Sequence, residues 1–413
     1  MVDCKYRRQI YLNTFAPVLL EFVEWVLEQA EKRGIYRLYF LARDGYQMYL
    51  AAAHLCELRN IKIECRYLYG SRYAWRIPQF ATMGSDCLDV ICRGGINVTF
   101  EKVLKRGGLI DVEIQQVAKE LNFTAQYQRI LSYSEVLQLK KPLAESKQFL
   151  PCVYEKSRAS YETTIGYFRQ EGLFDEVKYA LVDSGWTGSL QQTLIKLLEQ
   201  EGCKKAIEGF YFGLYELPAR VKKEKYHTFY FGPQNGMRRK VYFSNCLYEA
   251  VYSAPHGMTI GYEKKGESYV PVFYKEQSLN QNMMEQEEEW LKAFLAEYEG
   301  PETTTQAYPL LKRLMGKPTK EEARAYGNLL FSDDVTEEYT QPVAAKLTKE
   351  EVKNQYVWNR ILLMLGIKKQ ELKDSAWIEG SIALAEECHD WQMLHVRLYK
   401  YLIYFRKWLK RGK

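Results

Sequence analysis

Residues 177–200 constrain the fold of this chain more than any other stretch. Residues 177–183 (VKYALVD) are mostly aromatic, aliphatic or β-branched, and they end in an acid. A turn that contains Gly185 and Gly188 follows, and residues 189–200 (SLQQTLIKLLEQ) place their leucines on one face of a helix. A buried strand, a glycine-containing turn and an amphipathic helix in this order predict one unit of a parallel, helix-covered sheet.

A second unit of the same kind lies earlier in the chain. Residues 36–42 (YRLYFLA) predict a strand, residues 46–58 a helix and residues 61–69 another strand. Residues 207–215 (IEGFYFGLY) predict a further strand. We therefore expect an α/β fold built on a parallel sheet, in which the loops after the strands share one edge.

Segments that lack this strand-turn-helix pattern predict an insertion and a further domain. The 413 residues suit two or three domains. The segment at about 80–176 is mostly polar and helical in pattern, and the chain becomes acidic and then helical after residue 275. We expect an α/β core over residues 1–275 with a helical insertion at about 80–176, and a helical C-terminal domain over residues 276–413.

Composition narrows the classes of function. The formal net charge of +6 favours anionic partners such as phosphates or a membrane surface, and it is too small to indicate nucleic acid. Nine cysteines without a CxxC pair argue against a zinc site and a disulfide framework, and they favour a reducing compartment. Because the N-terminus has no signal-peptide pattern and no stretch predicts a membrane span, we expect a cytoplasmic protein.

The loop after the strand at 177–183 is the strongest candidate for a ligand site. Free N–H groups and the dipole at the start of the following helix attract anions. Glycines let the backbone approach a ligand closely, Thr187 and Ser189 add hydroxyl donors, and Asp183 is placed to face a ribose. The predicted sugar-phosphate site comprises Asp183, Ser184, Gly185, Trp186, Thr187, Gly188 and Ser189. The alternative is a plain strand-to-helix turn with a serine cap.

The loop after the strand at 36–42 is the second candidate. Arg43 can hold a phosphate through two hydrogen bonds, and Gly45 allows a tight turn into the helix. Two anion-binding loops on one sheet edge predict a ligand with two separated phosphate groups. A structural ion pair between Arg43 and Asp44 is the alternative. Because Ala42 stands where haloacid-dehalogenase-type phosphatases carry a nucleophilic aspartate, we expect no phosphatase activity.

Both loops resemble those of type I phosphoribosyltransferases. The matching residues are Ala42, Arg43 and Gly45 in the pyrophosphate loop of that family, and Asp183, Thr187, Gly188 and Ser189 in its phosphate loop. This chain departs from the family at Ser184, which replaces a second acid, and in the shorter second loop. The resemblance implies that Arg72 and Arg76, which follow the second predicted strand, contact the pyrophosphate of the donor.

A closer resemblance covers more of the chain. It is carried by YRLYFLARDGYQMY (36–49), YLYGSRYAWRIP (67–78), LVDSGWTGSLQQTL (181–194) and LYEAVYSAPHGMTIGY (247–262). These stretches are similar to a bacterial family found with capsule and O-antigen genes, whose members are often described as predicted haloacid-dehalogenase hydrolases. The resemblance implies transfer of 5-phosphoribosyl from phosphoribosyl pyrophosphate, bound with Mg²⁺, to a hydroxyl of a glycan or lipid-linked oligosaccharide. It also implies that a separate phosphatase then leaves ribofuranose.

The general base stays open between three residues. Asp44 is the first candidate because it lies beside the predicted leaving group, where Arg43 would stabilise the developing charge. Glu249 and His256 are the next candidates, and a structural hydrogen bond is the alternative for each. A function of another class also stays open, because the loss of the second acid at Ser184 favours a non-catalytic sugar-phosphate-binding scaffold of a polysaccharide assembly complex.

The final segment, residues 396–413 (VRLYKYLIYFRKWLKRGK), is basic and aromatic. The apolar face of the predicted helix comprises Leu398, Tyr401, Leu402, Phe405 and Leu409. Such a helix can lie on an anionic membrane, which would place the protein on the inner face of the membrane. The alternative is a packed helix with a solvated basic face.

Overall fold

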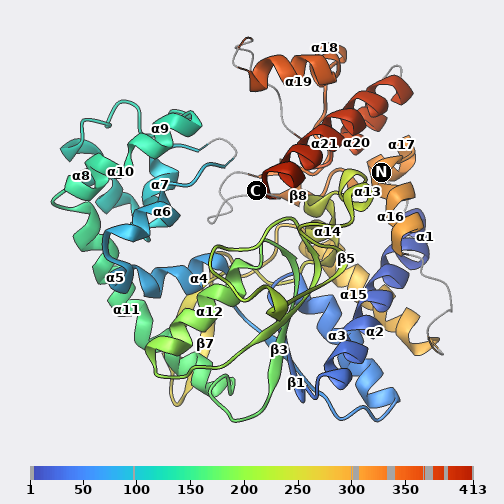
Figure 1. Ribbon diagram of the computed structural model, residues 1–413, viewed down its shortest axis with the longest axis horizontal. Coiled ribbons are helices and arrows are strands. Elements are labelled where there is room, and N and C mark those ends of the chain that lie inside the picture. Colours follow the sequence, from blue (N-terminus) through green and yellow to red (C-terminus); the bar gives the residue numbers. More distant parts are fainter. Residues whose placement is uncertain are drawn as a thin grey trace.

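A five-stranded parallel sheet lies at the centre of the fold (Figure 1). The computed structural model describes residues 4–95, 98–298, 300, 307–332, 340–365, 367, 375–385 and 389–411. The strands are β1 (Arg37–Leu41), β2 (Glu64–Leu68), β3 (Tyr179–Trp186), β4 (Glu208–Leu214) and β5 (Tyr226–Phe231), in the spatial order β2-β1-β3-β4-β5. The predicted α/β fold with a parallel sheet is confirmed.

Burial explains why these segments are strands. Every residue of β1 and of β4 is buried, whereas β2 at the edge of the sheet is mostly half-exposed. Central parallel strands are covered on both faces, so they need apolar side chains at successive positions rather than at alternate ones. The aromatic and aliphatic runs of the sequence meet that requirement.

Helices cover both faces of the sheet. On one face lie α2 (Ala16–Lys32) and α3 (Gly45–Leu58), which share an apolar core with β1 and β4. On the other face lie α11 (Phe149–Gln170) and α12 (Ser189–Gln200), which pack against β1 and β3. The result is a three-layer arrangement with the sheet in the middle.

The segment between β2 and α11 forms a separate helical body, at the left of Figure 1. Its helices are α4 (Arg72–Arg76), α5 (Phe80–Met83), α6 (Leu88–Ile91), α7 (Phe100–Arg106), α8 (Asp111–Glu120), α9 (Tyr133–Gln138) and α10 (Lys140–Glu145). From α5 onward they enclose an apolar cluster of their own. The long helix α11 joins the two parts, because Phe149 and Val153 belong to that cluster while Ile165 and Phe168 pack under the sheet.

The chain after β5 continues the main core. Its elements are α13 (Met237–Val241), α14 (Asn245–Tyr252), an antiparallel hairpin of β6 (Thr259–Lys265) and β7 (Ser268–Phe273), α15 (Gln281–Ala296), α16 (Ala307–Gly316), α17 (Lys320–Tyr326), β8 (Leu330–Phe331), β9 (Gln341–Pro342), α18 (Lys349–Asn354), α19 (Val357–Met364), α20 (Ile378–Leu384) and α21 (His389–Arg411). Leu311 of α16, Tyr326 of α17 and Ile382 of α20 join the same apolar cluster as α2 and α3. The C-terminal helices therefore share one core with the sheet.

The strand order places a crevice beside β1 and β3. The chain moves outward from β1 to β2 and then returns across β1 to reach β3, so the direction of winding reverses between β1 and β3. In open α/β sheets, ligands bind at such a reversal, outside the carboxyl ends of the strands. The two loops singled out in the sequence follow these two strands.

One helical stretch is long and apolar enough to cross a membrane by length and composition alone, Cys4–Lys32. It comprises α1 (Cys4–Ile10), a π-helical turn (Tyr11–Phe15) and α2. In the fold, 61% of its most apolar window is buried. Its apolar side chains therefore pack in the core against β1, β4 and neighbouring helices.

Candidate functional site

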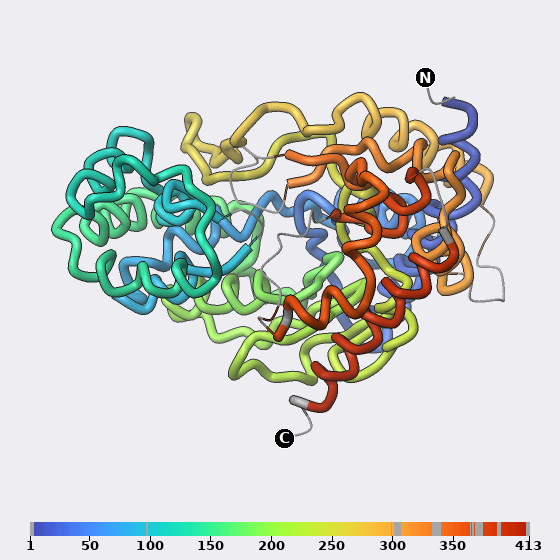
Figure 2. Tube along the Cα trace, turned by 90° about the horizontal axis from the view of Figure 1, so that it is seen from above, coloured from blue at the N-terminus to red at the C-terminus, as the bar shows by residue number. Residues whose placement is uncertain are grey.

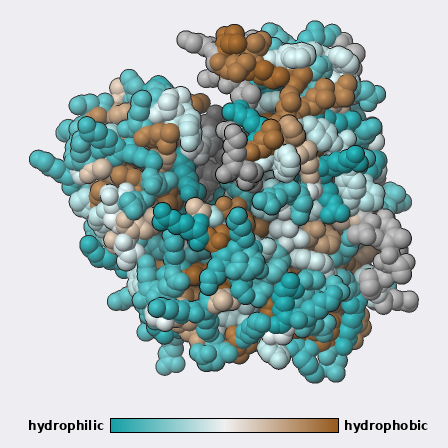
Figure 3. All heavy atoms as spheres, in the orientation of Figure 1, coloured by the Kyte–Doolittle hydropathy of each residue, from teal (hydrophilic) through white to brown (hydrophobic). Residues whose placement is uncertain are grey.

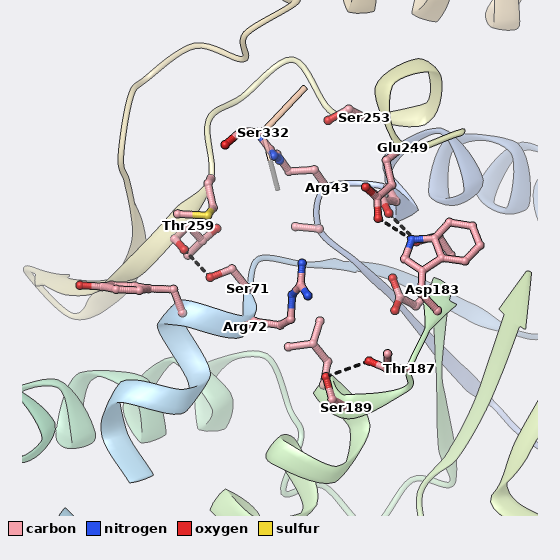
Figure 4. Close-up of a pocket in the computed structure, with 18 of the residues that line it drawn as sticks. Arg43, Ser71, Arg72, Asp183, Thr187, Ser189, Glu249, Ser253, Thr259 and Ser332 are labelled. Carbon is pink, nitrogen blue, oxygen red and sulfur yellow. Dashed lines mark hydrogen bonds between the residues drawn. The ribbon is translucent and has the colours of Figure 1, made fainter. Parts of the chain in front are cut away.

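A pocket of about 360 Å³ opens at the carboxyl ends of β1 and β3 (Figure 4). Its walls come from the loops after β1, β2 and β3, from α14, and from the helical insertion. Of the fifteen residues predicted from the sequence to form the site, twelve line the pocket: Ala42, Arg43, Asp44, Arg72, Arg76, Asp183, Ser184, Gly185, Trp186, Thr187, Ser189 and Glu249. The other three, Gly45, Gly188 and His256, do not line it.

The loop after β1 is anchored before it reaches the pocket. The Ala42 N–H donates to the Leu68 carbonyl oxygen at 3.0 Å, which holds the loop against the end of β2, and the Ala42–Arg43 peptide bond is cis. A Cβ atom on Gly45 would lie 3.0 Å from the carbonyl carbon of Phe40. Gly45 is thus required for the close packing of α3 on β1 rather than for contact with a ligand.

The loop after β3 differs from its predicted form. The strand continues to Trp186, so the turn into α12 consists of Thr187 and Gly188. A Cβ atom on Gly185 (φ 108°) would lie 2.5 Å from the Gly213 carbonyl oxygen. One on Gly188 (φ 60°) would lie 2.7 Å from the ring of Tyr226. Protein atoms therefore occupy the space that a side chain at either position would need, so the packing of the turn by itself requires both glycines.

The polar groups of this turn face the pocket at the start of α12. The Thr187 N–H donates to the Gly185 carbonyl oxygen at 2.9 Å, so this amide is already used within the turn. The Thr187 hydroxyl donates to the Ser189 hydroxyl oxygen at 3.3 Å, and so does the Arg76 guanidinium at the same distance. The first amides of α12 have no acceptor one turn earlier in the helix, which makes this terminus an anion-binding feature.

Three carboxyl groups converge on one side of the pocket. Asp44 accepts a hydrogen bond from the Ser184 hydroxyl, and Glu249 accepts one from the Trp186 indole N–H. Burial, followed by the charges of Asp44 and Glu249, raises the pKa of Asp183 well above its usual range. Burial and then Asp44 raise the pKa of Glu249 to about 8, and burial raises that of Asp44. Because three carboxylates share this site, it resists full ionisation and favours the arrival of a positive charge.

Ser184 follows Asp183 in β3 and lies next to Asp44. Its hydroxyl satisfies Asp44 without adding a fourth negative charge. A second aspartate at this point would stand against Asp44 and beside Asp183, where like charges repel. The third carboxyl of the site, Glu249, comes from α14.

Arginines cover the other side of the pocket. Arg72 and Arg76 lie on α4, Arg93 follows α6, and Arg106 ends α7. Burial, then the charges of Arg72, Arg93 and Arg106, lower the pKa of Arg76 to about 9. Within the part of the chain that the structure describes, Arg72, Arg76 and Arg93 form no ion pair with a carboxylate. A cluster of neighbouring guanidinium groups attracts a highly charged anion.

Arg93 and Arg106 were not among the residues predicted from the sequence to line the site. Both precede paired glycines, in Arg93-Gly94-Gly95 and Arg106-Gly107-Gly108. This repeated tripeptide is the one local signal that marks them. The Arg106 guanidinium donates to the carbonyl oxygen of Arg93, which couples the two segments.

Arg72 stands at the boundary between the two charged groups. Its charge lowers the pKa of each of the three carboxyls, and it also lowers the pKa of Arg76. Figure 4 shows the Arg72 side chain extending into the pocket, with Asp183 and Glu249 on one side of it and Ser71 on the other. The positively and negatively charged groups of the pocket therefore meet at this residue.

His256 lies outside the pocket lining. Its Nε2 atom is 2.7 Å from the Tyr67 hydroxyl oxygen, and its Nδ1 atom is 2.8 Å from the Gly257 carbonyl oxygen. Burial lowers its pKa to about 4, so the ring is neutral at pH 7 and Nδ1 is the nitrogen that carries the proton and donates to the carbonyl. Both nitrogens are engaged in structural hydrogen bonds.

Two carboxyl groups of the pocket, Asp44 and Asp183, could contact a metal ion that arrives with a phosphate ligand. Among the residues that the structure describes, no group of three or more His, Cys, Asp or Glu side chains is arranged to hold a metal ion. Magnesium is commonly held by one or two protein carboxylates together with phosphate oxygens of the substrate. Asp44 and Asp183 fit that role.

No protein-family model matches this chain, and no curated protein is significantly similar to it.

Proposed function

We propose that the protein is a glycosyltransferase that transfers 5-phosphoribosyl from phosphoribosyl pyrophosphate to a hydroxyl of a bacterial surface glycan and releases pyrophosphate. Its fold would then be of the type I phosphoribosyltransferase kind, with the helical insertion closing one side of the donor pocket. The acceptor would be a glycan or a lipid-linked oligosaccharide. A separate phosphatase would remove the 5-phosphate.

The segregation of charge inside one pocket supports this proposal most. Arg72, Arg76, Arg93 and Arg106 gather on one side, and the three carboxyls lie on the other with Arg43 next to them, at the reversal of strand order. Phosphoribosyl pyrophosphate has the complementary distribution, because its diphosphate is strongly anionic while its ribose becomes positively charged as the bond to the leaving group breaks. A site with both features stabilises the transition state more than the ground state.

Different residues of the pocket would bind different groups of the donor. The 5-phosphate would lie on the amides that open α12, with the hydroxyls of Thr187 and Ser189 as further donors. The diphosphate would lie against Arg72 and Arg76. Asp183 would face the ribose, whose developing positive charge its carboxylate favours.

Proton transfer is assigned to Asp44. It lies beside Arg43 in the loop after β1 and is held by the Ser184 hydroxyl, which leaves it oriented toward the pocket. Its raised pKa makes it a stronger base than an exposed aspartate, once the positive charge of the donor site has ionised it. Mg²⁺ bound with the donor would neutralise diphosphate charge, with Asp44 and Asp183 as the protein groups able to contact it.

A transfer assay tests this function. Purified protein receives donor labelled in the ribose, Mg²⁺ and an extracted polysaccharide, and both polymer-bound label and free pyrophosphate are measured. We expect the two to appear in equal amounts, and to fall by at least about 100-fold in Asp44→Asn. Donor binding without either product, across a panel of capsule and O-antigen extracts, would refute the catalytic function.

The scaffold function is supported by one observation, the serine at position 184. Without a second acid, the site could hold a sugar phosphate without activating it. Product formation separates the two functions: a scaffold binds phosphoribosyl pyrophosphate without releasing pyrophosphate, whereas a transferase releases pyrophosphate when an acceptor is added. Release of phosphate from p-nitrophenyl phosphate would instead indicate a phosphatase.

A further inference from the structure

Large apolar side chains are exposed most densely near the C-terminus of the chain. Among the described residues, nineteen large hydrophobic side chains are exposed, and eleven of them lie between residues 358 and 409. They are Trp358, Leu362, Leu365, Ile367, Trp391, Leu394, Leu398, Leu402, Phe405, Trp408 and Leu409. Contiguous apolar surface of this kind marks a site of association.

Helix α21 has two apolar faces, and the fold uses only one of them. Met393 and Val396 are buried in the main core, and the ring of Tyr404 stacks on Tyr215 with centroids 5.8 Å apart. Tyr401, expected from the sequence on the exposed face, is half-buried. The exposed row begins earlier than predicted, at Trp391, and is 43–56% exposed along its length.

Helix α19 extends this surface sideways. The ring of Tyr356, just before α19, stacks on His395 of α21 at 4.5 Å, and the Arg360 guanidinium lies 5.1 Å from the centre of the Tyr399 ring. These contacts bring Trp358, which is 69% exposed, close to α21. In Figure 3, hydrophobic side chains gather over α19 and α21 at the top of the molecule. The tube in Figure 2 shows the C-terminal end of α21 projecting beyond the rest of the chain.

The charge of α21 indicates which partner fits this surface. Residues 389–411 contain six Lys or Arg and one Asp or Glu, a difference of five positive charges. Two copies of this helix packed together would place like charges side by side, whereas an anionic lipid surface attracts them. The aromatic residues Trp391, Phe405 and Trp408 are of the kind that settle at the boundary between lipid headgroups and acyl chains.

We propose that α19 and α21 form a platform that binds the protein to the surface of an anionic phospholipid membrane. The apolar row would enter the headgroup region, and Arg406 and Lys407, both exposed, would contact lipid phosphates. This surface is independent of the donor pocket. The platform requires α19 as well as α21. The sequence pattern did not indicate the contribution of α19.

Vesicle flotation of the full chain tests the platform. We expect the protein to float with vesicles that contain phosphatidylglycerol, to stay unbound with pure phosphatidylcholine, and to dissociate as salt is raised. Arg406→Gln with Lys407→Gln should weaken binding by about 30-fold, since each basic residue near an anionic surface contributes about 1 kcal/mol. The matched control is Lys62→Gln with Lys178→Gln, two lysines that precede β2 and β3 at the amino ends of these strands. It removes the same charge and should leave binding unchanged.

Apolar variants complete the test without removing α21, whose buried face the fold requires. Phe405→Ser and Trp358→Ser should each weaken flotation at least tenfold, while Tyr36→Ser, at an exposed position before β1, should not. Equal flotation of all variants, or no binding to phosphatidylglycerol vesicles, would overturn the proposal. A dimer in sedimentation that Phe405→Ser dissociates would also overturn it, because the surface would then belong to a second copy of the chain.

Discussion

Replacement of Arg76 by methionine should make the ligand-free protein more stable. The side chain keeps its length and apolar stem, while the variant removes a charge that is disfavoured first by burial and then by three other guanidinium groups. A fall of the pKa from 12.5 to about 9 corresponds to at most about 5 kcal/mol of unfavourable free energy in the folded state at pH 7. Because water and counter-ions screen an open pocket, we expect a gain in unfolding free energy of about 2–3 kcal/mol.

The same variant should lose its response to an anion. Pyrophosphate at about 100 times its dissociation constant should stabilise the native protein by about 2.7 kcal/mol, which for a chain of this size raises Tm by about 3 °C. Arg76→Met should abolish most of this rise, since the guanidinium is one of the groups that the anion pairs. A variant that is more stable than the native protein without ligand, but less stabilised by the ligand, is expected when the replaced residue belongs to a binding site.

Differential scanning fluorimetry and urea unfolding, with and without pyrophosphate, measure both quantities. Arg59→Met is the matched control, because Arg59 makes two 2.6 Å hydrogen bonds to the Glu24 carboxylate outside the pocket. It should lower the unfolding free energy by about 1–3 kcal/mol and keep the full pyrophosphate response. Destabilisation by Arg76→Met together with an unchanged pyrophosphate response would refute the assignment of the arginine cluster as an anion site.

Four further outcomes are expected. The pKa of Glu249 rises from 4.5 to about 8 on folding, so the folded protein holds an extra proton between these values and loses stability as pH increases through them. Glu249→Gln should therefore reduce the fall in urea-unfolding free energy between pH 5 and pH 8. Thr187→Ala should weaken calorimetric donor binding by about 1.5–3 kcal/mol, and Asp183→Asn should retain the circular dichroism spectrum but lose transfer. Turnover of p-nitrophenyl phosphate should be undetectable, since Ala42 is not a nucleophile, and turnover that Asp44→Asn abolishes would contradict this.

The elements of the sheet were predictable because their signals are local. A run of buried side chains, a turn with glycine and a leucine-faced helix are each encoded within about twenty residues, and α12 and α3 begin within a residue of their predicted positions. That the loops after β1 and β3 meet follows from the parallel arrangement alone, because the carboxyl ends of parallel strands share an edge. The extent of β3 was underestimated, since its last residues pair with β4 rather than forming the turn.

Local sequence patterns therefore predicted the class of fold, the two loops and the polar residues in those loops. The packing of the folded chain determined which distant groups join them: Arg93 and Arg106 reach the pocket from the insertion, Glu249 reaches it from α14, and His256 is held away from it by Tyr67. It also decided that α19 and α21 expose one apolar surface. The physical reason is that burial, charge repulsion and packing depend on distances between atoms that no local pattern of residues specifies.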